Sequence, residues 1–401
     1  MEPANMSTTP SLPFASPEEV GLSTDRLRRL SRVLGAECER KRLPGAVVLV
    51  ARRDRIAWLD HVGVRDPASG APMTADAIFR IYSMTKPIVS VAAMMLAEEG
   101  RLLLGDPVSR YLPRFAGQTV LVERDGRAEY VPAARETTVQ DLLRHTSGLT
   151  YEFLGCGPVH QRYVDEGLGD PSRSAADLCD RLAPIPLIHH PGAAFAYGRS
   201  TDVLGRLLEV ISGRSLGQLL RERVLGPLRM NDTAFHVPED GQDRIAEPFA
   251  HDPDTGAAVQ LLDARTRPVL ETGGGGLLST AMDYARFCQM LANGGTLDGE
   301  RLLGRKTIEY MTADHLGSTA IDGDVLTPGY GFGLGFAVRR AGGIAPFPGS
   351  AGQYHWGGIA GTVFWIDPRE QLFAILMIQA PGQSDYYRTM FRWLVHATVA
   401  D

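Results

Sequence analysis

Ser83 and Lys86 have the residue types and spacing needed for nucleophilic chemistry. The pattern S-x-x-K places both side chains on one face of a helical turn. A helix N-terminus favours an anion such as a deprotonating hydroxyl, and burial disfavours an ammonium, so we expect a neutral lysine amine beside the serine. Such an amine can accept the serine proton, which an arginine cannot do. Only three of the 41 basic residues are lysines, so Lys86 stands against a strong bias towards arginine.

The motif alone is weak, because an S-x-x-K is expected by chance about one time in seven. Its position strengthens it. The pair lies where the strand-like run FRIY (79–82) meets the apolar run 88–96, in which a charged lysine would be unfavourable. The structural alternative is a serine N-cap with a lysine that reaches solvent. Pro87 disfavours helical geometry at Lys86 and predicts a distorted first turn.

The elements that would position this pair follow from hydrophobic periodicity. An amphipathic helix is expected over 17–41, a strand hairpin over 45–51 and 56–64, and a buried helix over 88–96 with Gly100 as its C-cap. Helices are expected at 139–144, 175–182, 201–211, 216–224 and 280–293. Strand signals occupy 331–338, 353–366 and 372–378, and a last helix covers 386–399.

Strand signals therefore lie at both ends of the chain, with helices between them. This layout predicts an α/β fold of the α+β type, in which the N- and C-terminal segments form one antiparallel sheet flanked by helices. We expect residues 17–104 and 271–401 to form this α/β domain, residues 105–270 to form an inserted, mainly helical domain, and residues 1–16 to be a disordered leader.

Composition excludes several classes of function. The net charge is −6 and no block of basic residues occurs, so neither nucleic acid nor an anionic membrane is an expected partner. The four cysteines are widely spaced, which indicates buried free thiols, and no histidine has metal-ligand spacing, so no metal or other cofactor is expected. The N-terminus lacks the features of a secretory signal, and a cytoplasmic location is expected.

The run FRIYSMTKPI resembles the S-x-x-K region of serine β-lactamases and penicillin-binding proteins. The chain is most similar to the β-lactamase-fold carboxylesterases, called family VIII, which are related to class C β-lactamases. Segments 138–149, 191–213, 226–235 and 273–287 occur in the order typical of this group. The resemblance implies a β-lactamase/transpeptidase-like fold and an acyl-enzyme on the nucleophile.

The resemblance also implies a catalytic tyrosine, which is Tyr197 in the sequence Tyr197-Gly198-Arg199. Tyr197 would contact Ser83 and Lys86, act as a base in acylation and protonate the leaving alcohol. Lys86 and Tyr197 are both candidates to accept the serine proton. Arg199 replaces the asparagine that β-lactamases carry, and it would contact an anionic group or form a salt bridge.

The third element of β-lactamases, K-T-G, is absent, and its counterpart is W-G-G at 356–358. By resemblance, the N–H groups of Ser83 and Ile359 would form the oxyanion hole. The glycines would let a substrate approach the strand backbone. The expected substrate-binding residues are Trp356, Gly357, Gly358, His355 and Arg199.

The expected function is hydrolysis of short-chain carboxylic esters, with a small-molecule ester as the only implied partner. A β-lactamase or D-amino-acid peptidase, an acyltransferase, and a non-catalytic penicillin-recognising protein are the alternatives. Ser350 lies in a sequence that resembles G-x-S-x-G, but a proline replaces the first glycine, so we expect a loop serine there. The run Gly273–Gly276 lacks phosphate-loop spacing and indicates a close backbone approach instead.

Overall fold

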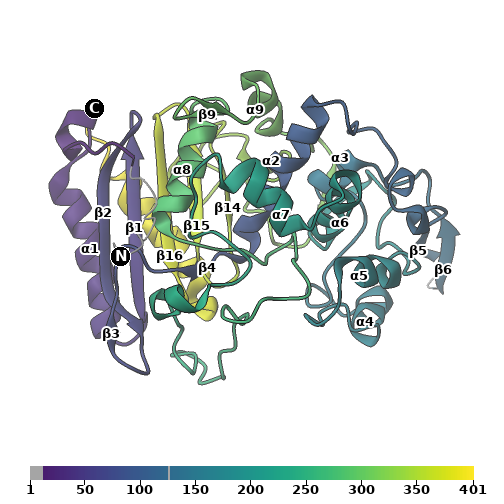
Figure 1. Cartoon of the computed structure of the whole chain (residues 1–401), viewed down its shortest axis with the longest axis horizontal. Helices are drawn as coiled ribbons and strands as arrows, with labels where there is room; N and C mark the ends of the chain where they lie inside the picture. The colour runs from purple at the N-terminus through teal and green to yellow at the C-terminus, as the bar shows by residue number, and fades with distance from the viewer. Residues whose placement is uncertain (1–11, 125–126) are drawn as a thin grey trace, which may run out of the picture.

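The computed structural model describes residues 12–124 and 127–401, and its centre is one eight-stranded antiparallel sheet (Figure 1). The strand order is β12-β13-β14-β15-β16-β1-β2-β3. Their bounds are β1 (Gly45–Arg52), β2 (Arg55–Asp66), β3 (Ala71–Pro72), β12 (Tyr330–Phe332), β13 (Ala337–Arg339), β14 (Tyr354–Gly357), β15 (Val363–Asp367) and β16 (Leu372–Ile378).

Strand β1 joins the two ends of the chain, because it pairs with β2 on one side and with β16 on the other. In the β1–β16 register, Ala46 lies opposite Ile378 and Arg52 lies opposite Leu372. The predicted α/β fold, with an antiparallel sheet built from both terminal segments and flanked by helices, is confirmed.

Both faces of the sheet are covered, which explains why β1 reads as a continuous apolar run. Side chains alternate between two clusters: Val47 and Leu49 belong to the larger core, while Val48 and Val50 belong to the smaller one. Helices α1 (Thr24–Glu39) and α10 (Ser384–His396) cover the smaller core, and α8 (Ala281–Ala292) covers the opposite face.

The remaining elements lie between β3 and β12 in the sequence. The helices are α2 (Thr85–Glu98), α3 (Val139–Leu143), α4 (Pro158–Asp165), α5 (Ala175–Leu182), α6 (Ser200–Ser212), α7 (Leu216–Leu220) and α9 (Arg305–Met311). The short strands are β4 (Phe79–Arg80), β5 (Thr119–Arg124), β6 (Arg127–Pro132), β7 (Ala194–Ala196), β8 (Leu278–Ser279), β9 (Thr296–Leu297), β10 (Glu300–Arg301) and β11 (Ala320–Asp322). Helices α3, α4, α5 and α6, with β5 and β6, occupy the side of the molecule opposite α1 in Figure 1.

Some expectations differ from the structure. Residues 1–11 of the predicted leader lie outside the described residues, but the prediction is wrong for 12–16, because Leu12 is buried in the core and Phe14 bridges to Ile56. The strand signals at 331–338 and 353–366 each correspond to a hairpin, β12–β13 and β14–β15, and not to one strand. Cys179 and Cys288 are buried free thiols, whereas Cys156 is exposed.

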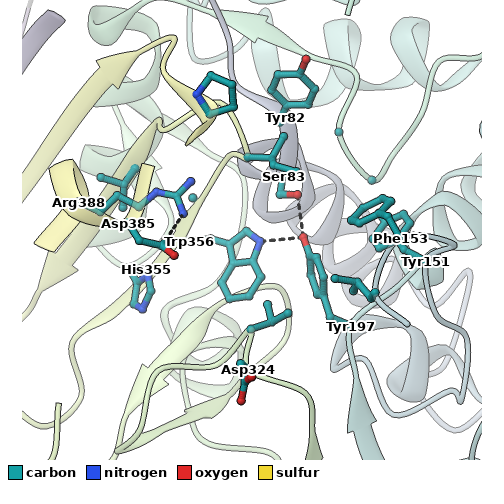
Figure 2. Close-up of a pocket in the computed structure, with 18 of the residues that line it drawn as sticks. Tyr82, Ser83, Tyr151, Phe153, Tyr197, Asp324, His355, Trp356, Asp385 and Arg388 are labelled. Carbon is teal, nitrogen blue, oxygen red and sulfur yellow. Dashed lines mark hydrogen bonds and ion pairs between the residues drawn. The ribbon is translucent and has the colours of Figure 1, made fainter. Parts of the chain in front are cut away.

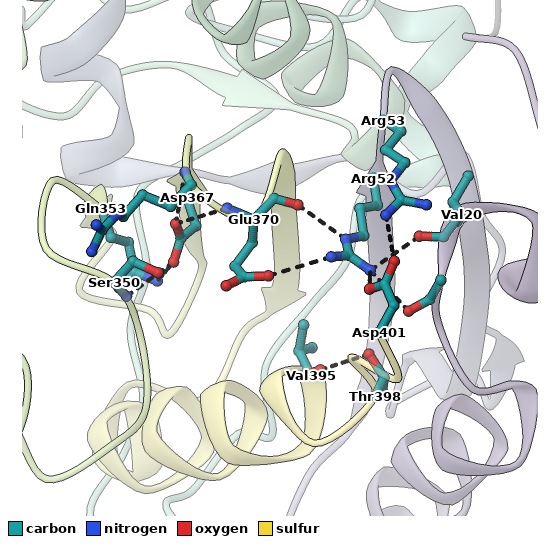
Figure 3. A network of polar contacts seen from close by, with 12 residues as sticks. Val20, Arg52, Arg53, Ser350, Gln353, Asp367, Glu370, Val395, Thr398 and Asp401 are labelled. Carbon is teal, nitrogen blue, oxygen red and sulfur yellow. Dashed lines mark hydrogen bonds and ion pairs between the residues drawn. The ribbon is translucent and has the colours of Figure 1, made fainter.

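An arginine clamp ties the far end of β1 to neighbouring loops (Figure 3). The Nη1 atom of Arg52 donates to the carbonyl oxygens of Val20 and Gly21, at 3.1 and 2.8 Å, and also to Asp401. Its Nε donates to the Glu370 carbonyl at 3.0 Å. Within the described residues, no helix combines the length and the apolar character needed to cross a bilayer.

Candidate active site

A cavity of about 920 Å³ lies where the start of α2 faces β14, and Ser83, Tyr197 and Trp356 line it together (Figure 2). Residues far apart in sequence thus share one site. In the close-up, Tyr151 and Phe153 lie on one side of this group, and His355 and Arg388 lie on the other. We refer to this space as the main cavity.

Ser83 is held in a short 3-10 turn, Tyr82–Met84, between β4 and α2. Tyr82 has a φ of 43°, a conformation that costs a non-glycine residue about 1–3 kcal/mol and that is common at functional sites. Its phenol oxygen accepts a hydrogen bond from the Leu262 N–H at 2.8 Å, which helps to hold the strained turn. Pro87 is the third residue of α2, where its missing N–H leaves no bond unmade, so the predicted distortion falls before the helix and not within it.

Lys86 is fully buried beneath Ser83. Its Nζ atom donates to Ser83 Oγ at 3.2 Å, to Tyr151 Oη at 3.1 Å and to the Gly274 carbonyl oxygen at 2.6 Å. The short contact to a carbonyl requires Lys86 to be a donor there, since a carbonyl oxygen has no proton to give. Because Lys86 is fully buried and bonded to these three oxygens, the alternative in which this lysine reaches solvent is wrong.

Tyr197 completes the group around the serine. It follows β7, and its Oη atom donates to Ser83 Oγ at 2.7 Å. The indole Nε1 of Trp356 donates to the same Tyr197 oxygen at 3.2 Å (Figure 2). The His145 ring packs 4.7 Å from the Tyr197 ring, and burial, with the nearby Lys86 charge, holds the pKa of His145 well below its usual range. The neutral imidazole of His145 therefore packs against the Tyr197 ring and helps to hold it in place.

Tyr151 is a site residue that sequence reasoning missed. It is buried, and its phenol oxygen lies 3.1 Å from Lys86 Nζ. Burial, reinforced by the charge of Asp202, raises the pKa of Tyr151 well above its usual value, so this phenol keeps its proton. Tyr151 can orient Lys86 but cannot act as a base. No motif marks it, because it follows a loop without periodic pattern.

A buried polar chain supports Lys86 from behind. Asp202 on α6 accepts a hydrogen bond from the Gly274 N–H at 2.9 Å, and the Gly274 carbonyl oxygen is the one that Lys86 contacts. Arg199 lies 3.8 Å from Asp202 and forms a tighter pair with Glu152, at 2.7 Å. Of the two roles considered for Arg199, the structure shows the salt bridge, although the residue also borders the main cavity.

The glycine run at 273–276 makes the close backbone approach that the sequence indicated. A Cβ atom on Gly273 would lie 2.5 Å from the Thr201 carbonyl oxygen, and one on Gly274 would lie 2.7 Å from Tyr151 Oη. Larger residues would push this segment away from Lys86 and Asp202. The interpretation of this run as a packing feature is confirmed.

The two glycines of W-G-G leave room for protein neighbours, which differs from the expected close approach of substrate. A Cβ on Gly357 would lie 3.2 Å from Arg388 Cζ, and one on Gly358 would lie 2.3 Å from the Ile81 carbonyl oxygen. Gly357 and Trp356 border the main cavity, whereas Gly358 is buried behind it. Ile359 follows with a half-exposed side chain at the cavity, and its N–H has no acceptor among the described residues.

His355 also borders the main cavity, but both ring nitrogens are inaccessible to solvent and have no partner among the described residues. Its ring packs edge-on against Tyr330, with centroids 4.9 Å apart. Burial, with the charge of Arg392, holds the pKa of His355 well below its usual range. This environment fits a neutral packing residue better than a polar substrate contact.

No group of three His, Cys, Asp or Glu residues in the described chain is arranged to hold a metal ion. Ser350 lies outside the main cavity, and its backbone N–H donates to Asp367 at 3.0 Å (Figure 3). Among the described residues, neither a lysine nor a tyrosine forms a hydrogen bond with the Ser350 hydroxyl, whereas both do so with Ser83. Ser83 is therefore the serine with a nucleophile's neighbours.

Comparison with known proteins agrees with this geometry. The sequence model of the Beta-lactamase family matches residues 28–397. Protein Rv1367c of Mycobacterium tuberculosis is 37% identical over 354 residues, which are 85% of this chain and 87% of that protein. Esterase EstB of Burkholderia gladioli is 32% identical over 371 residues, covering 87% and 89%. The structure of EstCE1, described as a hydrolase with promiscuous acyltransferase activity, superposes with a TM-score of 0.79 at 28% identity, covering 92% of this chain and 98% of that one. The chain therefore belongs to the Beta-lactamase family and is a serine hydrolase of the β-lactamase fold.

Proposed function

We propose that the protein hydrolyses carboxylic esters with short acyl chains through an acyl-enzyme on Ser83. The observation that carries the proposal is the position of Ser83 Oγ in the main cavity, 2.7 Å from Tyr197 Oη and 3.2 Å from Lys86 Nζ. Both neighbours are within the distance at which a proton can be exchanged with the serine hydroxyl.

In this mechanism Tyr197 reacts in its deprotonated form, after its phenol proton has left to solvent, and the phenolate then accepts the serine proton as Ser83 Oγ attacks the ester carbonyl. Tyr197 is the nearer of the two groups, and Lys86 is already committed as a donor to the Gly274 carbonyl at 2.6 Å. Lys86, one hydrogen bond from the serine, stabilises the negative charge that develops as the proton leaves. Tyr197 then protonates the leaving alcohol, and it accepts a proton from the water that releases the acid.

The negative oxygen of the tetrahedral intermediate would be held by the N–H groups of Ser83 and Ile359. Two features support this assignment. The Ile359 N–H is free of intramolecular acceptors among the described residues. On the other side, Gly275 carries no side chain, and a Cβ there would contact the Ser83 nitrogen at 3.8 Å.

Two features favour esters over lactams. Arg199, which replaces the β-lactamase asparagine, is engaged by Glu152, and Trp356 stands where the K-T-G lysine would be, donating to Tyr197. Neither group is free to hold a lactam's amide or carboxylate. The similarity to EstB, named as an esterase, supports the same choice.

Acyl transfer is a second candidate, supported by the size of the main cavity. A volume of about 920 Å³ is near the upper end of ordinary ligand pockets and exceeds the need of a simple alkyl ester. It leaves room for a bulky alcohol, which can serve as the leaving group or as the acceptor. The similarity to EstCE1 points the same way.

The test is release of p-nitrophenol from p-nitrophenyl acetate and butyrate, with an alkyl fluorophosphonate and peptide mapping to locate the labelled residue. We expect turnover, labelling at Ser83, and loss of both in Ser83→Ala. Ser350→Ala is the matched control and should retain both. Labelling at another residue, or nitrocefin turnover faster than ester turnover, would contradict the proposal. An added alcohol that captures the acyl group at low concentration would favour acyl transfer.

A further inference from the structure

We propose that Arg388 on α10 is a positioning residue for the oxyanion hole, because it holds the peptide group that joins Gly358 to Ile359. The inference rests on the proposed function, in which the Ile359 N–H binds the developing oxyanion. It concerns a residue that lies on the last helix, remote in sequence from Ser83, Lys86 and Tyr197, and that no motif marked.

The contacts place the guanidinium on the turn between β14 and β15. Arg388 Nη2 donates to the carbonyl oxygen of Gly358 and, at 3.4 Å, to that of Thr362. The Gly361 N–H donates to the same Gly358 oxygen at 2.8 Å, which closes the turn. Gly357 makes room for the arginine, since a Cβ there would lie 3.2 Å from Arg388 Cζ.

The geometry of a peptide group turns this contact into a constraint on the site. None of the described peptide bonds is cis, and in a planar trans peptide the C=O and N–H point in opposite directions. The Gly358 carbonyl is held on the Arg388 side, so the Ile359 N–H must point away from Arg388. This N–H has no acceptor among the described residues, and Ile359 borders the main cavity.

The charge of Arg388 adds to its geometric role. A cation at the carbonyl oxygen draws electron density through the amide and strengthens the N–H at the other end as a donor. The nearby carboxylate is Asp385, 3.4 Å from Nη1, and its side chain is 96% exposed, so solvent screens it. Arg388 itself is only 23% exposed. Its field on the turn is therefore weakly neutralised.

The alternative is that Arg388 only stabilises the β14–β15 hairpin and has no effect on the oxyanion hole. Two substrates that differ in one atom distinguish this structural role from the positioning role. Sulfur is a poorer hydrogen-bond acceptor than oxygen, so a thionoester draws less on the oxyanion hole than its oxygen ester. We therefore compare p-nitrophenyl acetate with p-nitrophenyl thionoacetate in the full chain and in Arg388→Met and Arg388→Lys.

We expect Arg388→Met to lower kcat for the oxygen ester by on the order of 10²-fold with KM within about threefold, the loss typical of one oxyanion donor. The ratio of oxygen-ester to thionoester kcat/KM should fall about tenfold. Arg388→Lys, which keeps the charge, should recover part of both. An equal loss on the two substrates, or an unchanged kcat in Arg388→Met, would overturn the inference.

Arg52→Met is the matched control, because Arg52 is also a buried arginine that binds backbone carbonyls (Figure 3) and it does not line the main cavity. The ratio of oxygen-ester to thionoester kcat/KM in Arg52→Met should equal that of the wild type. A drop in this ratio similar to that of Arg388→Met would count against a specific role for Arg388. The wild-type rate tests the proposed function separately. If wild type hydrolyses neither ester, the fluorophosphonate labelling rate of Ser83 serves instead: about tenfold slower labelling of Arg388→Met supports the inference, and equal rates overturn it. A wild-type chain that is also not labelled overturns both proposals.

Discussion

Asp202→Asn tests whether the buried chain behind Lys86 matters for activity. The substitution keeps the shape of the side chain but removes the charge that faces Arg199, 3.8 Å away, and weakens the acceptor for the Gly274 N–H. Because the Gly274 carbonyl oxygen contacts Lys86 at 2.6 Å, a looser Gly274 should loosen Lys86. We expect losses of both stability and activity.

The magnitude follows from these distances. At an effective dielectric constant of about 20, a 3.8 Å ion pair is worth about 4 kcal/mol before desolvation. Arg199 keeps Glu152 as a partner, so the net loss of unfolding free energy should be smaller, about 3 kcal/mol including the weakened hydrogen bond. With an unfolding entropy of about 2.1 cal/mol/K per residue, this lowers Tm by about 4 °C. A Lys86 displaced at a cost of about 1.4 kcal/mol lowers kcat about tenfold.

Thermal unfolding and steady-state hydrolysis of p-nitrophenyl acetate, well below Tm, separate the two effects. Glu152→Gln is the matched control, since it removes the other anion of Arg199 but leaves Gly274 untouched. It should lower Tm to a similar extent while kcat stays within about twofold. Equal kcat in the two variants, or wild-type kcat in Asp202→Asn, would refute the proposed support of Lys86 through Gly274.

Three further predictions concern single residues. Tyr197→Phe should lower kcat for p-nitrophenyl esters by on the order of 10³-fold, because the general acid–base group is lost, and a change below threefold in steady-state assays would exclude that role. Burial alone would raise the pKa of Asp141, but hydrogen bonds from an arginine and two threonines outweigh the effect of burial and lower this pKa to about 2. Ionised Asp141 therefore adds about 2 kcal/mol to the free energy of unfolding above pH 4, and this contribution is lost as the pH falls towards 2. Urea unfolding at a series of pH values should show this loss in the wild type and not in Asp141→Asn. Gly358→Ala should reduce activity at least tenfold, because its Cβ would lie 2.3 Å from the Ile81 carbonyl oxygen, whereas Gly342→Ala, with open space around it, should match wild type in the same ester assay.

Strong hydrophobic patterns made much of the fold predictable. The hairpin of β1 and β2 and the helix over 175–182 follow from local periodicity, and the helix is found at those residues. Strand boundaries that depend on a turn between two apolar segments were harder to predict. The run 353–366 contains enough apolar residues for one strand, but Gly358 and Gly361 form a turn that splits it into β14 and β15.

The nucleophile and lysine could be predicted because one helical turn joins them in sequence. Tyr197 required a resemblance, since nothing local relates it to Ser83. Tyr151 and Asp202 could not be found at all: they act through tertiary contacts with Lys86 and Gly274, and a buried tyrosine or a helix-start aspartate has no distinctive pattern. The sequence located the W-G-G glycines but not why glycine is needed there. They leave room for Arg388 and for the Ile81 carbonyl, which only the fold brings close to them.

The pairing of β1 with β16 has a consequence for biosynthesis. Strand β1 ends at Arg52 and β16, which covers the open edge of β1, begins at Leu372, so the covering strand is synthesised roughly 320 residues after the edge it covers. At about 5–20 residues per second, that edge stays uncovered for roughly 20–70 seconds. A nascent chain with an apolar, unpaired edge is prone to aggregate, so this protein should depend on chaperones until β16 has been synthesised.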